Sequence, residues 1–266
     1  MIDEEAFNIK KDIEKSGFPL EIELSNLLRN NGWGVAHQAY FYDSEEGKSR
    51  ALDIIASRLE TFTSSKFDRL TVGLFIECKR IMDKPWVFYT IPKGEDHAPD
   101  IGPLFFVKFY SLPELEPREY RLLQFTHLFV ENIPRIATIS YEPFSLGKTK
   151  RVFTATNQVL KALAYKKKTG KDLLGKFTSI IKGAVHILYP LIVLDGKIYK
   201  CETSADGIEV SPVDYVQYQI SHGVSGELGK EETYLVEIMR KDFLTTYLGW
   251  LDNEIKKMVQ FASENL

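Results

Sequence analysis

Two short segments of the chain place charged side chains inside runs of apolar residues. Leu70–Lys79 (LTVGLFIECK) is apolar for most of its length and ends in Glu77 and Lys79, while Ala51–Ser57 (ALDIIAS) carries Asp53 among apolar neighbours. Both segments are typical of strands, in which successive side chains point to opposite faces. Glu77 and Lys79 therefore share one face. Because a buried charge is costly unless it is paired or binds a metal, these residues indicate a chemical site.

Asp53 comes to lie beside Glu77 if the two segments pair as a hairpin. Adjacent carboxylates repel each other, and a hard divalent cation with oxygen ligands relieves that repulsion. Such an ion lowers the pKa of a bound water and offsets charge on a phosphate in the transition state. Lys79 would contact the same water or phosphate, and Glu21, on the preceding helix, would complete the metal shell or orient a water. The pattern predicts metal-assisted chemistry on a phosphate group.

The elements that must position these residues read as a helix followed by three strands. Leu20, Leu24, Leu27 and Leu28 recur at helical spacing after a break at Gly17–Pro19, and Gly32 suits the left-handed position that ends a helix. A short charged helix over Met1–Lys15 precedes them. The strands are expected at Trp33–Tyr42, Ala51–Ser57 and Leu70–Lys79, with a turn at Asp43–Ser49.

The third strand is apolar on both faces, which is typical of a central strand covered on both sides. We therefore expect an α/β fold in which helices flank a mixed central sheet. Asp83–Pro143 is rich in proline and is expected to be an insertion of loops, short strands and one helix near Glu119–Leu128. The later elements are expected at Val152–Lys168 (helix), Ala184–Leu194 and Lys197–Cys201 (strands joined at Asp195–Gly196), Tyr234–Met239 (strand) and Phe243–Phe261 (helix).

No linker divides the chain, so residues 1–266 are expected to form one domain, with an insertion over 83–143 and a C-terminal strand and helix over 231–266.

The order of these motifs resembles the PD-(D/E)XK superfamily, which has the restriction-endonuclease-like fold. That family has a helix with a glutamate, a strand with an aspartate and a strand that ends in (D/E)-X-K; the corresponding segments here are PLEIELSNLLRNNGW, ALDIIA and FIECK. The segment ECKRIMDKPWVF is similar to Mrr-like branches, in which a Lys/Pro/Trp run follows the lysine. The resemblance covers roughly residues 17–90 and continues loosely through Asn157–Tyr165 and the strands after Ala184.

The resemblance implies a role for each matching residue. Asp53 and Glu77 would be metal ligands, with the Cys78 carbonyl as a third ligand. Lys79 would position or activate the nucleophilic water. Glu21 matches the helix glutamate better than Glu23 does.

Two features depart from the family pattern. Gln158 stands where some branches carry a glutamine on the second core helix, but the tyrosine of the full glutamine–tyrosine motif is absent, because Tyr165 lies seven residues on rather than four. No proline precedes Asp53, a position that varies widely in the family.

A basic segment offers a candidate nucleic-acid surface. The chain has a formal net charge of −3, yet Lys148–Lys182 holds ten Lys/Arg against one acid, Asp172. Such a patch could meet phosphates, or it could be a solvated helix face with a lysine-rich loop, and charge alone does not separate the two. The candidate nucleic-acid-binding residues are Lys148, Lys150, Arg151, Gln158, Lys161, Lys166, Lys167 and Lys168.

Other chemistries have little support in the sequence. Two distant cysteines make neither a disulfide framework nor a four-ligand zinc site. The five histidines show no metal-binding spacing, and no phosphate-binding glycine loop is present. The N-terminus has no apolar signal core and no apolar run is long enough to span a bilayer, so we expect a cytoplasmic protein without membrane contact.

The leading hypothesis is an endonuclease that cuts DNA with Mg²⁺ or Mn²⁺, in prokaryotic defence or DNA processing. A second is a nuclease-fold subunit that binds nucleic acid as a scaffold in a complex with an ATPase or helicase. A third is an RNase of the same fold, because the residues themselves do not separate DNA from RNA. Cutting both strands of a duplex usually needs two sites, so a homodimer is the default expectation.

Overall fold

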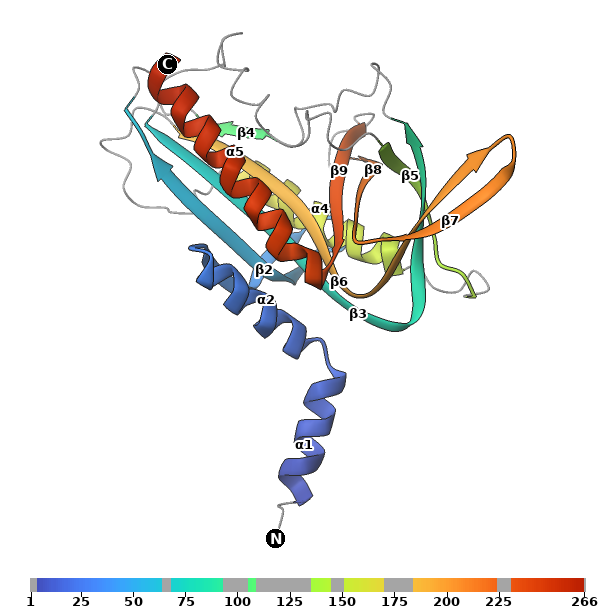
Figure 1. Cartoon of the computed structure of the whole chain (residues 1–266). Coiled ribbons are helices and arrows are strands. Elements are labelled where there is room, and N and C mark those ends of the chain that lie inside the picture. The colour runs from blue at the N-terminus through green and yellow to red at the C-terminus, as the bar shows by residue number, and fades with distance from the viewer. Residues whose placement is uncertain are drawn as a thin grey trace.

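The computed structural model describes residues 4–63, 68–92, 105–108, 135–144, 151–169, 184–223 and 231–265. These residues form a nine-stranded mixed sheet with helices on both faces (Figure 1). Helices α2 (Phe18–Asn30) and α5 (Leu244–Asn265) cover one face, and α4 (Arg151–Thr169) covers the other. The predicted α/β class, with a mixed sheet flanked by helices, is confirmed.

The remaining described elements follow in chain order. They are α1 (Glu4–Lys15), β1 (Gly34–Asp43), β2 (Lys48–Thr61), β3 (Arg69–Pro92), β4 (Phe105–Lys108), β5 (Arg135–Tyr141), β6 (Ala184–Ser204), β7 (Gly207–Val213), β8 (Tyr215–Gly223), β9 (Glu231–Arg240) and a 3₁₀ turn, η3 (Lys241–Phe243).

The N-terminal half builds a helix and an antiparallel three-strand meander, as predicted. Pro19 lies in the first turn of α2, where its missing N–H costs nothing, and Gly32 follows the helix with φ +81°. The amide of Trp33 donates to the Leu28 carbonyl and closes the helix end. β1 then pairs with β2, and β2 with β3, both antiparallel.

β3 is much longer than the predicted strand, because it continues past Lys79 to Pro92. The expectation of loop structure from Asp83 onward was therefore wrong for its first residues. Pro85 can lie inside a strand because the pairing of β3 with β6 shifts register between Ile81 and Trp86, where no ladder hydrogen bond is required of it. β5, near the end of the expected insertion, pairs with the distal half of β3. The helix expected near Glu119–Leu128 lies outside the described residues.

β6 is one strand, and the expected turn at Asp195–Gly196 was wrong. Both residues continue the parallel ladder, opposite Arg80 and Ile81. A Cβ at Gly196 would lie 2.4 Å from the Ile81 carbonyl oxygen. The glycine thus permits a close approach of two backbones, where the sequence alone indicated a turn.

The path from β3 to β6 gives the fold its second half. β6 runs parallel to β3 over almost its whole length, and α4 lies between them in sequence. The pairings β3–β5, β5–β8, β8–β9, β9–β6 and β6–β3 then close a circuit of five strands. The described core therefore joins a flat meander at one side to a curled group of strands at the other (Figure 1).

Two apolar clusters fill the two faces of the sheet. One joins leucines of α2 to the inner face of α5 through Ile54, Ile76 and Cys78. The other joins α4 to Leu52, Phe75 and strands of the curled half. The central part of β3 is buried throughout, which confirms the prediction of a strand covered on both sides.

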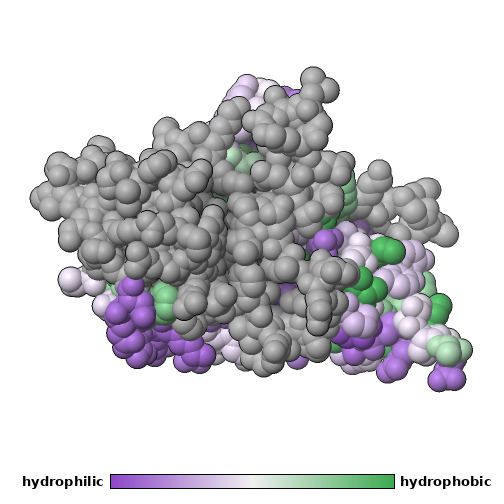
Figure 2. Space-filling view, turned by 90° about the horizontal axis from the view of Figure 1, so that it is seen from above, coloured by the Kyte–Doolittle hydropathy of each residue, from purple (hydrophilic) through white to green (hydrophobic). Residues whose placement is uncertain are grey.

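Apolar side chains also reach the surface in places. Figure 2 shows hydrophobic residues among hydrophilic ones at the right-hand end of the described surface, the side on which β7 projects in Figure 1. Ile139, Tyr141, Ile208 and Val210 are exposed on β5 and β7. Helix α1 projects away from the body of the molecule (Figure 1). Within the described residues, no helix is both long and apolar enough to cross a bilayer.

Candidate active site

The site begins at an irregularity shared by β1 and β2. Gln38 has φ +47°, unusual for a residue other than glycine, and the β1–β2 ladder passes over Gln38 and Asp53. Ile54 packs with α2 and α5, whereas Leu52 packs with α4, although both would share a face in a regular strand. The alternation of side chains therefore shifts at Asp53, which separates this residue from regular pairing.

The β2–β3 ladder ends at the same level. Its last pair is Ile54 with Ile76, and Asp53 and Glu77 come directly beyond it. The Cys78 amide, free of the ladder there, donates a 2.7 Å hydrogen bond to Oδ2 of Asp53. Burial raises the pKa of Asp53, and that hydrogen bond and the charge of Lys79 partly offset the rise.

Glu77 is a buried carboxylate with one engaged oxygen. Its side chain is 2 % exposed, and Oε1 accepts a hydrogen bond from the Lys79 ammonium. Among the described residues, Oε2 has no hydrogen-bond partner. Burial raises the pKa of Glu77 to about 7; Lys79 opposes the rise, and Asp53 and Glu21 add to it. The carboxyl group is thus poised to hold either a proton or a cation at neutral pH.

Glu21 lies on α2 and is buried against the start of the meander. Nε2 of Gln38 donates a 2.8 Å hydrogen bond to its Oε2. Burial raises the pKa of Glu21, the Gln38 hydrogen bond lowers it, and the negative charge of Asp53 raises it further. The four predicted residues, Glu21, Asp53, Glu77 and Lys79, are therefore close enough to act on one another electrostatically.

The donor set fits a cation that takes few protein ligands. Three carboxylates face one ammonium, so the cluster carries excess negative charge when all are ionised. Across the described ranges, no group of three His, Cys, Asp or Glu side chains is arranged to hold a metal by itself. Mg²⁺ commonly binds through one or two carboxylates and completes its shell with water and substrate phosphate. Asp53 and Glu77 match that requirement.

Cys78 has no sign of reactivity. Its side chain is 7 % exposed and packs with the α2–α5 cluster, opposite the face of Glu77 and Lys79. Burial raises the pKa of the thiol well above its usual value, and the neighbouring carboxylates raise it further. Only its backbone contributes to the site, through the hydrogen bond to Asp53.

Several predicted nucleic-acid-binding residues already have protein partners. Gln158 donates from Nε2 to the Ala51 carbonyl, at 2.8 Å, and so ties α4 to β2. Arg151 pairs with Asp83 at 3.0 Å. Lys166 lies on α4 and is half-buried. Lys148 and Lys150, and the side chains of Lys167 and Lys168, lie outside what the structure describes.

Lys161 belongs to a network that the sequence did not reveal. It contacts Asp43 at 2.9 Å and Glu45 at 2.7 Å. Asp43 is buried and also accepts hydrogen bonds from Arg50 and from the amides of Glu45 and Glu46. Burial raises the pKa of Asp43, but Lys161 and the two amides outweigh it and hold the pKa below its ordinary value. An aspartate that opens a turn such as DSEEGK is the one signal that could have indicated it.

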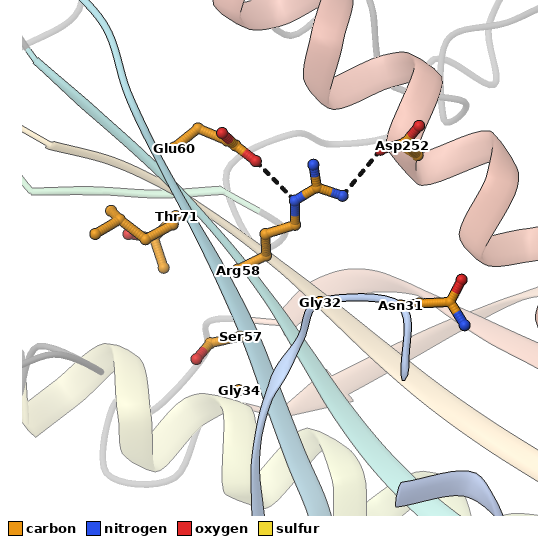
Figure 3. A pocket seen from close by; sticks show the side chains of 9 residues that line it. Asn31, Gly32, Gly34, Ser57, Arg58, Glu60, Thr71 and Asp252 are labelled. Atoms are coloured by element: carbon orange, nitrogen blue, oxygen red, sulfur yellow. Dashed lines mark hydrogen bonds and ion pairs between the residues drawn. The ribbon is translucent and has the colours of Figure 1, made fainter. Parts of the chain in front are cut away.

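A separate hollow of about 620 Å³ lies between the end of α2, β2 and α5. Its walls include Arg58, which is held between Glu60 at 2.7 Å and Asp252 at 2.9 Å (Figure 3). Since the guanidinium is already compensated by two carboxylates and none of the four predicted residues lines the hollow, it is not the candidate active site.

Comparison with known proteins gives no match. No family model fits the chain, and no curated protein and no solved structure is similar to it.

Proposed function

We propose that the chain is a metal-dependent nuclease of the PD-(D/E)XK type, which hydrolyses phosphodiester bonds with Mg²⁺ or Mn²⁺. The observation that carries the proposal is the meeting of Asp53, Glu77 and Lys79 where the β2–β3 ladder ends, with Glu21 of α2 beside them. An ion pair at a surface strand end would not require a buried carboxylate with an unpaired oxygen.

The topology supports the same proposal. A helix, a three-strand antiparallel meander, a second helix and a strand parallel to the third follow one another as α2, β1, β2, β3, α4 and β6. That order agrees with the restriction-endonuclease-like core that the motifs resemble. Fold alone does not assign an activity, so the proposal depends on the residues of the site.

In the proposed reaction each residue has a separate task. Asp53 and Glu77 would hold the cation, and the Cys78 amide would keep the Asp53 carboxylate in place. Lys79 would hold the attacking water or a phosphate oxygen once Glu77 turns to the cation. Glu21, oriented by Gln38, would accept a hydrogen bond from a water. The bound cation supplies a lower pKa for that water and charge neutralisation at the phosphate.

The direct test is cleavage of a substrate panel. Supercoiled plasmid, linear duplex, single-stranded DNA and RNA are incubated with Mg²⁺, Mn²⁺ or EDTA, beside the Lys79→Ala protein. We expect cutting that needs metal and falls at least 100-fold in the variant. Lys256→Ala, an exposed lysine on α5, is the matched control and should cut as the wild type does. Undiminished cutting by Lys79→Ala would reject this site.

One observation favours a second candidate, a catalytically silent scaffold that binds nucleic acid beside an ATPase or helicase. Lys79 neutralises Glu77 directly, so the pair can persist without a cation. A scaffold should bind nucleic acid equally well with and without Mg²⁺ and should cut no member of the panel. Metal-dependent cutting would exclude this candidate.

A further inference from the structure

Two tyrosines on β1 are exposed where a sheet edge would ordinarily carry charge. The side chain of Tyr40 is 78 % exposed and that of Tyr42 is 52 % exposed. β1 is the terminal strand of the sheet in the described part of the chain. Edge strands are usually protected by charged residues, because exposed apolar edges promote aggregation. Two adjacent exposed aromatic rings therefore suggest a binding function.

The two rings continue a row that starts at the candidate active site. Beyond the irregularity at Gln38, the side chains of Phe41 and Asp43 point toward α4 and are buried. Gln38, Tyr40 and Tyr42 alternate with them and so point to the opposite face. Gln38 itself contacts Glu21. The row thus leads from the carboxylates outward along β1.

The spacing of the rings suits a planar base. Residues i and i+2 of a strand lie about 6.7 Å apart on the same face. Stacked bases are about 3.4 Å apart, so one base fits between two such rings, or two bases stack on them in turn. Aromatic stacking of this kind is the usual way in which proteins hold single strands without reading their sequence.

The strand that carries the rings is fixed before any ligand arrives. Asp43 ends β1 and binds the turn amides, Arg50 and Lys161, and so anchors the β1–β2 hairpin to α4. Preorganised groups lose less conformational entropy on binding than mobile ones. Tyr40 and Tyr42 therefore form a platform on a rigid support.

We propose that Tyr40 and Tyr42 hold an unpaired base of a single-stranded nucleic acid next to the carboxylate cluster. The inference rests on the proposed function and narrows its substrate to strands with unpaired bases, such as single strands, flaps or frayed ends. A base inside an intact duplex is stacked on both sides and has no free face to offer the rings.

The test measures binding in EDTA, so that it does not depend on catalysis. A labelled single-stranded oligonucleotide and a hairpin duplex of the same length are titrated, and a 2-aminopurine base in the single strand reports stacking by its quenching. Tyr40→Ala and Tyr42→Ala should each weaken single-strand binding by about 5- to 150-fold and relieve the quenching. Tyr40→Phe and Tyr42→Phe keep the rings and should bind as the wild type does. Tyr141→Ala removes an exposed tyrosine of β5 and is the control for a general surface effect.

The outcomes separate this inference from the proposed function. If the double alanine variant binds single strands as tightly as the wild type, the platform is rejected even if metal-dependent cutting persists. If it loses single-strand binding while no variant cuts anything, the platform stands and the nuclease does not. If the alanine changes alter only the oligomeric state in light scattering, the face joins two copies of the chain and the inference is wrong.

Discussion

Glu77 is the residue at which folding and function are most clearly opposed. Its carboxyl group is 2 % exposed and only one of its oxygens has a hydrogen-bond partner within the described structure. Burial raises its pKa to about 7, so in the folded chain without metal it keeps its proton over a range in which the unfolded chain loses it. A group of this kind lowers stability when it ionises and is retained where its charge is needed.

The first prediction is that stability of the metal-free protein falls between about pH 4.5 and pH 7 because of this group. The folded pKa is raised, so the folded state binds more protons than the unfolded state in that window and is favoured at its lower end. The difference between a pKa of about 7 and the ordinary 4.5 corresponds to at most about 3 kcal/mol.

Glu77→Gln removes the charge and should flatten this part of the profile. Urea unfolding in EDTA should find the variant more stable than the wild type at pH 7.5 and similar to it at pH 4.5. A variant that is equally destabilised at both pH values would show that the carboxylate is satisfied in the folded state and that its raised pKa is wrong.

At this scale the sequence was informative where a charge interrupts an apolar run. Asp53, Glu77 and Lys79 could be singled out because each breaks a strand pattern, and the structure brings them together with Glu21. Asp43 and Gln38 could not be singled out in the same way, because a polar residue at a strand end or edge is ordinary. Their importance depends on Lys161 and Glu21, which are distant in sequence.

Among the elements, the parallel pair β3 and β6 determines where the site can form. β6 supports β3 along one side, while β2 leaves the other side open beyond Ile54. The pair is unusually close at Gly196, where any side chain would meet the Ile81 carbonyl oxygen at 2.4 Å. This contact lies two residues beyond Lys79 and fixes the strand that carries the E-X-K motif.

The second prediction concerns that contact. Gly196→Ala should destabilise the protein by roughly 1–3 kcal/mol, because a backbone atom cannot move aside as a flexible side chain can. Gly249→Ala is the matched control, since its Cβ would have nothing within 4 Å and it lies in the interior of α5. It should stabilise the protein by up to about 1 kcal/mol. Thermal unfolding of both variants, if it shows the same sign of change, would contradict this account.

Most elements could be predicted because helical spacing and apolar strands are local signals. The helices near 18–30, 151–169 and 244–265 were all expected close to their observed bounds. The uninterrupted lengths of β3 and β6 could not be predicted, because Pro85 and Gly196 normally end strands. Both are tolerated here only through long-range pairing, the register shift after Ile81 and the close approach of the two strands.

For the whole molecule, the carboxylate cluster lies where the flat meander meets the curled strands. α2 supplies Glu21, the meander supplies Asp53 and Glu77, and the β1 edge beside them carries the exposed Tyr40 and Tyr42. A strand of nucleic acid lying along β1 would therefore reach the cluster without entering an enclosed pocket. The sequence could not predict this surface, because the exposure of two tyrosines depends on β1 being an edge of the described sheet.

The central claim is that Asp53 and Glu77 hold a divalent cation, and Mn²⁺ binding tests it without knowledge of the substrate. Titration of the metal-free protein, followed by calorimetry or by the loss of the free Mn²⁺ spin-resonance signal, should detect binding that strengthens from pH 6 to pH 8, because Glu77 must give up its proton. Asp53→Asn and Glu77→Gln should each weaken it at least 10-fold, whereas Asp252→Asn, in the separate hollow, should leave it unchanged. Absence of binding at pH 8, or binding that survives both substitutions, would contradict the account.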